Sequence, residues 1–233
     1  MVLKLSERIL YEDNHLLVLN KPGGLLVQRD RTGDETLLDQ AKQYLKVKYH
    51  KPGNVFLALV HRLDRVSSGV LVLARTSKAA ARLSAAFRER RVAKFYLVAV
   101  EGRVRKSEGL LEDHLSWDEK RRKAKVHPTG QRARLRYRLL RRVGDLSLLL
   151  VRLETGRKHQ IRAQFAHRGH PVVGDWKYGS RKKVFGGRAI LLHAWSLVLP
   201  HPTRSEEMRF TAPLPAYWPQ ELKFEPPTLE LFA

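Results

Sequence analysis

Apolar positions near the start of the chain change from a strand spacing to a helical spacing. Residues 8–27 hold two short apolar runs, which are split by an acidic turn at 12–14 and followed by a Pro-Gly-Gly turn at 22–24. This pattern predicts two strands joined by a turn. Residues 36–47 place five apolar side chains on one stripe, which predicts an amphipathic helix. The stripe consists of Leu37, Leu38, Ala41, Tyr44 and Leu45.

A second helix is predicted after the apolar strand that ends near Ala74. Thr76 and Ser77 offer an N-cap at its start, because their hydroxyl groups can accept hydrogen bonds from the first backbone N–H groups of a helix. Residues further along share one apolar face, namely Ala80, Leu83 and Phe87. The basic residues that follow suit the C-terminal end of the helix dipole.

The second half of the chain has mostly strand-like patterns. Apolar segments begin at residues 94, 110, 123, 132 and 146 and are joined by glycine, proline or charged turns, which is typical of a largely antiparallel sheet. A third helix is predicted from Arg157 or Lys158 to about Gly169, and strands are predicted at 188–202 and 206–215.

The chain shows no internal repeat and no low-complexity linker. We therefore expect one α+β domain over residues 1–233, with its core at about 8–215 and a proline-rich tail at 216–233. The absence of an apolar stretch of about 18 residues and of a signal-peptide pattern predicts a soluble protein. With no cysteine, disulfides and thiolate metal sites are excluded, and the cytoplasm is the expected location.

The charge changes this picture most. Lys and Arg number 45 against 23 Asp and Glu, which gives a net charge of +22. Such an excess indicates a polyanionic partner, and nucleic acid is favoured over an acidic membrane surface. One strand concentrates the charge, because residues 132–140 alternate strictly between arginine and apolar side chains. Its arginines, Arg132, Arg134, Arg136 and Arg138, form either a phosphate-binding face or a solvated outer face of the sheet.

The polar and charged motif HRLD, from His61 to Asp64, lies between two segments whose apolar composition predicts buried strands. In an extended chain Arg62 and Asp64 project to one side, while His61 and Leu63 project to the other. A nearby guanidinium would keep Asp64 ionised, and an ionised carboxylate in a dry setting can act as a nucleophile or a base. Taken by themselves, these residues favour a structural ion pair.

The third predicted helix is a second candidate site. Its spacing puts Ile161 and Phe165 in the core and places His159 and Arg162 on a neighbouring face. Arg162 either reaches inward or is a surface charge. A metal site is not expected, because the spacing of the nearby ligand-type residues is poor and no HExxH motif occurs. Those residues are His159, His167, His170 and Asp175.

Together these stretches resemble the RluA family of pseudouridine synthases along nearly the whole chain. The matching motifs, in order, are ILYEDNHLLVLNKPGGLLV, HRLDRVSSGVLVLART, KFYLVAV, GRKHQIRAQFAHRGHPVVGDWKYG and LLHAWSLVLPHP. Five ordered matches are far more specific than a lone motif. The resemblance implies a mixed, largely antiparallel sheet with flanking helices and a central active-site cleft. It also implies isomerisation of uridine to pseudouridine in ribosomal or transfer RNA, without a cofactor or metal.

The resemblance also implies roles for single residues. Asp64 is the catalytic carboxylate, Tyr96 lies against the target base, and Arg162 pairs with Asp64. Arg62 occupies the space that the uridine leaves when it swings out of its stack. The expected substrate-binding set further includes His61, Lys94, His159, Ile161 and the four arginines of residues 132–138.

The chain departs from the family pattern at two places, and it leaves alternatives open. Val66 and Ser67 replace an acidic residue and Thr, and Lys158 replaces Thr, which affects substrate contacts and local loop packing. The pattern begins by Ile9, so no N-terminal S4 domain is expected. RNA is the expected partner of a monomer that needs no obligatory protein partner and no membrane. The alternatives are a catalytically silent RNA-binding or chaperone protein, and a metal-dependent nuclease that uses Asp64, Glu154 and Asp175.

Overall fold

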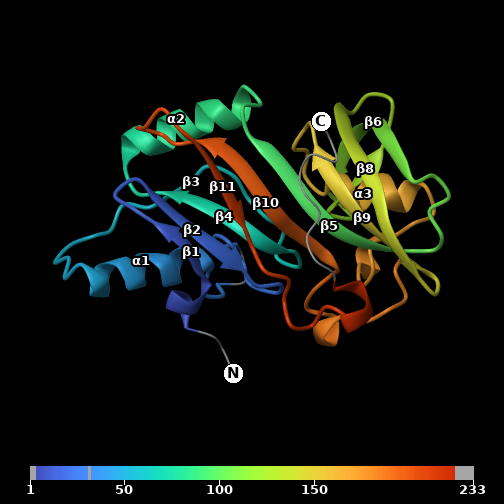
Figure 1. Ribbon diagram of the computed structural model, residues 1–233, viewed down its shortest axis with the longest axis horizontal. Helices are drawn as coiled ribbons and strands as arrows, with labels where there is room; N and C mark the ends of the chain where they lie inside the picture. Colours follow the sequence, from blue (N-terminus) through green and yellow to red (C-terminus); the bar gives the residue numbers. More distant parts are fainter. Residues whose placement is uncertain (1–3, 31–32, 224–233) are drawn as a thin grey trace. The chain divides into compact units, whose positions relative to one another are not determined.

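The computed structural model describes residues 4–30 and 33–223 (Figure 1). Its contacts divide the chain into two compact units. Unit 1 comprises Met1–Val92 and Ala194–Pro213, and unit 2 comprises Ala93–His193 and Leu214–Ala233. The described residues form strands and helices in both units, which confirms the α+β class. None of the helices in this described part is long and apolar enough to cross a bilayer.

Unit 1 is built from antiparallel strands with two helices. In Figure 1 its helices α1 and α2 lie on either side of its strands. Strand β2 pairs with β1 and β4, β3 pairs with β4, and β10 pairs with β11. The element bounds are η1 Leu5–Arg8, β1 Ile9–Glu12, β2 Leu16–Lys21, α1 Leu37–Lys48, β3 Ala58–Leu59, β4 Ser68–Ala74, α2 Ser77–Arg88, β10 Leu192–Pro200 and β11 Glu207–Thr211. The predicted strand, turn and strand of residues 8–27 are therefore present.

Both helices of unit 1 begin where the sequence predicts. The Thr36 hydroxyl accepts a hydrogen bond from the Asp39 backbone N–H at 3.2 Å, and the Asp39 carboxylate accepts from the Thr36 backbone N–H at 3.3 Å. This reciprocal pair forms a capping box for α1. The Thr76 hydroxyl caps α2 by accepting from the Ala79 N–H at 3.1 Å. The N-cap that was predicted at Thr76 or Ser77 is thus confirmed, with Thr76 as the capping residue.

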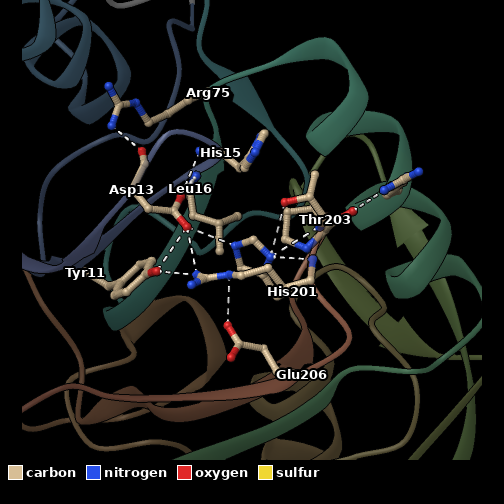
Figure 2. Close-up of polar contacts among 11 residues, drawn as sticks. Tyr11, Asp13, His15, Leu16, Arg75, His201, Thr203 and Glu206 are labelled. Atoms are coloured by element: carbon tan, nitrogen blue, oxygen red, sulfur yellow. Dashed lines mark hydrogen bonds and ion pairs between the residues drawn. The ribbon is translucent and has the colours of Figure 1, made fainter.

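A half-buried carboxylate ties two turns of unit 1 together (Figure 2). The Asp13 side chain accepts hydrogen bonds from the backbone N–H groups of His15 and Leu16 in the β1–β2 turn, at 2.8 and 2.7 Å. Its other oxygen accepts from the Tyr11 hydroxyl at 3.0 Å and from Nε2 of His201, just beyond β10, at 2.9 Å. This cluster, which we call the Asp13 clamp, joins the β1–β2 turn to the chain that leaves β10.

Unit 2 is an antiparallel sheet with the strand order β5-β9-β8-β6-β7. Helix α3 packs against it, because Ala163 lies in one apolar cluster with Leu115, Ala124 and Ala133. The element bounds are β5 Ala93–Glu101, β6 Glu108–Asp118, β7 Lys123–Val126, β8 Gln131–Val143, β9 Leu146–Leu153, α3 Gln160–His167, η2 Trp176–Tyr178, η3 Phe185–Gly187 and η4 Gln220–Leu222. The predicted antiparallel sheet is confirmed.

Helix α3 begins at Gln160, so the predicted start at Arg157 or Lys158 is wrong. The reason lies in the preceding loop. His159 has a left-handed backbone with φ 57° and ψ 22°, which cannot continue a right-handed helix. The Gln160 side-chain oxygen also accepts from the Thr155 hydroxyl and the Arg157 N–H at 2.7 and 3.0 Å, which holds this loop in place.

Part of the predicted tail belongs to the packed core of unit 2. Trp218 is 2% exposed and Leu222 is 1% exposed. The Arg141 guanidinium also donates to the Glu221 carbonyl at 3.1 Å. Buried side chains therefore extend beyond the core predicted at about 8–215. The remainder of the predicted tail, 224–233, lies outside the described residues.

Candidate active site

The charged stretch from His61 to Asp64 forms a loop between β3 and β4. His61 and Leu63 hold this loop from behind, as the alternation predicts. Nε2 of His61 accepts a hydrogen bond from the Val72 N–H at 2.9 Å, and its ring stacks on Phe87 with centroids 4.8 Å apart. Leu63 is buried. Arg62 is exposed on the same loop.

Asp64 begins a tight turn that ends at Ser67. The Ser67 N–H and hydroxyl both donate to the Asp64 carbonyl, at 3.1 and 3.0 Å. Arg65 anchors the same turn, because its Nε donates to the Gly24 carbonyl at 3.1 Å and its backbone carbonyl accepts from the Gly24 N–H at 2.8 Å. The Asp64 side chain is half-buried. The backbone that carries this carboxylate is therefore fixed by short-range hydrogen bonds.

Lys21 supports the Asp64 turn through hydrogen bonds to its carbonyl groups, and the sequence did not predict this role. Its side chain is fully buried, and its Nζ donates to the carbonyls of Pro22, Arg65 and Ser67 at 2.9, 3.1 and 2.7 Å. Burial lowers the pKa of Lys21 to about 7, although the nearby Asp64 charge opposes this shift. The signal in the sequence that could have identified Lys21 is its position between an apolar strand and the Pro-Gly-Gly turn.

In unit 2, Tyr96 and Lys94 lie on β5, where they are in register with Val151 and Leu153 of β9. Tyr96 is half-buried. Nζ of Lys94 donates to the Thr155 carbonyl at 3.4 Å, in the loop that leads into α3. A Cβ added at Gly156 would lie 3.3 Å from the same Nζ. Lys94 thus contacts the loop that precedes the HQIR motif.

Arg162 points into unit 2 and is 4% exposed, so the surface-charge alternative is wrong. Its guanidinium forms a bidentate ion pair with Asp175, with Nε–Oδ2 and Nη2–Oδ1 distances of 2.6 and 2.9 Å. Its Cζ also lies 5.0 Å from the ring centroid of Tyr178. This ion pair was not predicted from the sequence, where Asp175 was weighed only as a metal ligand and as an acid of the nuclease alternative. The implied pairing of Arg162 with Asp64 stays a prediction.

Tyr178 connects the start of α3 to the sheet. Its hydroxyl lies 3.0 Å from Nδ1 of His159 and accepts a hydrogen bond from the Ala124 N–H at 2.8 Å. These contacts fix the left-handed His159 residue directly before Gln160. Ile161 is 4% exposed, which confirms that it lies on the core stripe.

The four arginines of β8 lie on the outer face, as predicted, and acidic residues engage them. Ala133, Leu135 and Tyr137 are buried between them. Glu112 bridges Arg132 and Arg134, Glu154 bridges Arg134 and Arg136, and Arg138 pairs with Glu108. We call this series the Arg–Glu ladder. Its acids come from β6 and from the end of β9, which the alternation within a single strand could not reveal. RNA binding by these arginines stays a prediction.

Two of the three acids of the nuclease alternative, Glu154 and Asp175, are engaged by arginines. Glu154 is part of the Arg–Glu ladder, and Asp175 binds Arg162. Among the residues that the structure describes, no group of three or more His, Asp or Glu is placed to hold a metal ion. The geometry therefore gives the nuclease alternative no support.

Comparisons with known proteins point to one kind of enzyme. Residues 15–167 match a family model described as RNA pseudouridylate synthase. The chain is 35% identical over 226 residues to the ribosomal large subunit pseudouridine synthase C of Vibrio cholerae, with 95% of this chain and 70% of that protein covered. It is 34% identical over 208 residues to the dual-specificity RNA pseudouridine synthase RluA of Escherichia coli, with 88% and 92% covered.

Two solved structures of RNA pseudouridylate synthase domains also resemble this chain. The human RNA pseudouridylate synthase domain containing 4 matches with a TM-score of 0.76 and 27% identity, over 91% of this chain and 90% of that chain. The human RNA pseudouridylate synthase domain containing 1 matches with a TM-score of 0.72 and 28% identity, over 93% and 86%.

Proposed function

This chain belongs to the RluA family of RNA pseudouridine synthases, and from that premise we propose that Asp64 is the carboxylate on which its isomerisation depends. The enzyme converts uridine in RNA to pseudouridine. In this reaction the N1–C1′ bond breaks, a C5–C1′ bond forms, C5 loses a proton and N1 gains one. The atoms and electrons balance without a redox partner, so the proposal needs no cofactor or metal.

The observation that carries this proposal is the way in which the loop holds Asp64. Its turn is closed by Ser67 and supported from below by the buried Lys21. His61 and Leu63 secure the back of the loop, which fixes the backbone of a half-buried carboxylate. Preorganisation of this kind lowers the cost of placing a reactive group. Attack on the sugar, attack on the base and removal of a sugar proton are three roles open to Asp64.

We assign supporting roles to three further residues. Arg62 is exposed beside Asp64. It would fill the vacated stack when the uridine is extruded, a step that costs a few kcal/mol. Tyr96 would lie against the base and assist removal of the C5 proton. Arg162 would act as counterion to Asp64, because its buried guanidinium carries a positive charge that favours an ionised carboxylate.

The substrate is proposed to be ribosomal or transfer RNA. The named relatives support this range, since one is called a large-subunit ribosomal enzyme and another is called dual-specificity. We further propose that His61, Lys94, His159, Ile161 and the β8 arginines assist RNA binding. Monomeric state and a cytoplasmic location remain predictions. Pseudouridine maps of total cellular RNA with and without the gene would identify the modified RNA.

The Asp64→Asn substitution tests the proposal. We expect the variant to keep its affinity for RNA but to form no pseudouridine, because the amide has nearly the same shape and lacks the negative charge. Chemical mapping of pseudouridine after incubation of RNA with purified protein, without Mg²⁺, measures the product. The matched control is Asp145→Asn, which removes the charge of an exposed carboxylate that pairs with Lys182. Pseudouridine formed by Asp64→Asn at the wild-type rate would refute the role of Asp64.

A further inference from the structure

A cluster of cations and aromatic rings lies in unit 2 between the β6–β7 hairpin and the start of α3. The hairpin loop has the sequence Glu-Lys-Arg-Arg at residues 119–122. At its end, Arg122 has a left-handed backbone with φ 48°, a conformation that a side chain other than glycine adopts at some energetic cost. Lys123 follows directly and pairs in register with Asp118 across the hairpin. The structure thus holds a basic loop in one defined conformation.

Trp117 lies two residues before this loop and holds Lys158, a residue of the segment that precedes α3. Nζ of Lys158 lies 3.3 Å from the centroid of the Trp117 ring, which is a close cation–π contact. The other contacts of the ring are structural, since it meets His159 edge-on with centroids 5.3 Å apart and packs against the apolar cluster beneath α3. Lys158 is exposed, so its ammonium group is held at the surface.

Lys177 brings a second ammonium group to the same place. Its Nζ donates to the Arg122 carbonyl at 3.2 Å. Burial lowers the pKa of Lys177, and so do the positive charges of Arg162, Arg122 and Lys158, while Asp175 opposes them. That carboxylate is already bound by Arg162. Several cations thus act on Lys177, and the acid that opposes them, Asp175, is paired with Arg162.

We propose that Lys158, Lys177 and Arg122, with Lys158 held over the Trp117 ring, form a cradle for one backbone phosphate of the substrate RNA. This inference rests on the proposed function, and it assigns the cradle as an RNA-binding contact rather than as a catalytic group. A phosphate suits the place because it offers several acceptor oxygens to neighbouring cationic donors and relieves the mutual repulsion of the cations.

The cradle differs chemically from the Arg–Glu ladder. In the ladder each arginine has a glutamate partner, so a phosphate must compete with a carboxylate. In the cradle the contacts of the ammonium groups are an aromatic face and a backbone carbonyl, which carry no negative charge.

The test uses the full-length protein and the variants Lys158→Gln, Lys177→Gln and Lys158→Arg. The probe is a labelled transcript of transfer RNA or large-subunit ribosomal RNA, whichever the wild type modifies, or transfer RNA if it modifies neither. We expect each Gln variant to raise the Kd about tenfold at low salt and to reduce the slope of log Kd against log salt by about one. Lys158→Arg should keep both values close to the wild type.

Two further readouts separate the cradle from other roles. Lys46→Gln removes an exposed lysine from α1 in unit 1 and should change neither the Kd nor the slope. At saturating RNA, the single-turnover rate of pseudouridine formation should stay within about twofold for the Gln variants, since the cradle acts in binding.

The possible outcomes are distinct. If Lys158→Gln and Lys177→Gln bind RNA with the salt slope of Lys46→Gln, the cradle is refuted. If they bind normally but react slowly at saturation, the cradle is also refuted, because the lysines then act on the chemical step. If the wild type forms no pseudouridine, the proposed function fails, while the binding data still decide the cradle. Equal melting temperatures of all variants would exclude a folding defect.

Discussion

Lys21 places an ammonium group where its side chain has no exposed surface. Three carbonyl oxygens match the three N–H donors of the ammonium, which explains how the group is accommodated. Burial nevertheless lowers its pKa to about 7 from the usual value of 10.5. Between these two pH values the unfolded chain binds a proton that the folded protein has released. The contribution of Lys21 to stability therefore improves as pH rises from about 7 towards 10.5.

The Lys21→Met substitution isolates this effect. We expect the free energy of unfolding of the wild type to rise, relative to the variant, by up to about 1.4 kcal/mol per pH unit between pH 7 and 10. Urea unfolding at pH 7.5 and 9.5 measures the difference. Lys46→Met is the matched control, because that lysine is exposed on α1 and should leave the pH slope unchanged. Parallel pH profiles for wild type and Lys21→Met would contradict the assignment.

Among the secondary-structure elements, the Asp13 clamp shows how one carboxylate fixes the ends of several strands (Figure 2). Burial would raise the pKa of Asp13, but hydrogen bonds from His201, His15, Leu16 and Tyr11 outweigh it and lower the pKa to about 2. Nδ1 of His201 accepts from the backbone N–H groups of Thr203 and Arg204 at 3.2 and 3.0 Å, so the imidazole also orders the turn after β10. The clamp joins elements that are far apart in the sequence.

The clamp predicts a specific response to acid. Because the pKa of Asp13 is lower in the folded protein, the carboxylate stabilises the fold, and this contribution is complete above pH 3.8, the pKa of the unfolded chain. The contribution is lost as the pH falls towards 2. After allowance for solvent screening, we expect about 1 kcal/mol from this group. Asp13→Asn should therefore be less stable at pH 6 and lose less stability between pH 4 and 2. Acid titrations followed by circular dichroism measure this, and identical acid transitions would refute it.

The Arg–Glu ladder makes a second prediction for the elements. Glu154 lies 2.6 Å from Arg134 and 2.8 Å from Arg136, so removal of its charge releases Arg136 and leaves Arg134 with the longer 3.8 Å contact to Glu112. If this face contacts RNA, Glu154→Gln should lower the Kd several-fold and steepen its dependence on salt. Glu206→Gln, which removes the charge of an acid that pairs with Arg204 in unit 1, is the matched control. An unchanged Kd for Glu154→Gln would place the ladder outside the RNA contact.

Across the whole molecule, local patterns were predictable from the sequence because local chemistry determines them. The capped starts of α1 and α2 and the alternation of β8 depend on neighbours within a few residues. The start of α3 was not predictable, because it depends on a left-handed His159 that Tyr178 holds from another segment. Tertiary contacts of this kind are invisible to a periodicity argument.

The same division applies to the candidate site. The motifs identified Asp64, Tyr96 and Arg162 directly, since each belongs to a conspicuous stretch of sequence. They did not reveal that Lys21 supports the Asp64 turn, because it bonds to carbonyls 44 and 46 residues away. Nor did they reveal the ion pair of Arg162 with Asp175, which lies 13 residues away. The net charge of +22 predicted a polyanion but not where it binds, because the glutamates of the Arg–Glu ladder cancel much of the charge on one face.

The buried amine beneath the Asp64 turn has a consequence for chemical labelling. Burial holds the pKa of Lys21 near 7, and an opening that exposes the amine to water removes this cause and returns the pKa towards 10.5. In the folded protein Lys21 is shielded completely, so an acylating reagent can reach it when the Asp64 turn opens. The rate at which Lys21 is acylated, followed by peptide mass spectrometry, thus measures how often that turn opens. RNA bound over the turn would lower this acylation rate, so a non-catalytic lysine reports whether the site is occupied.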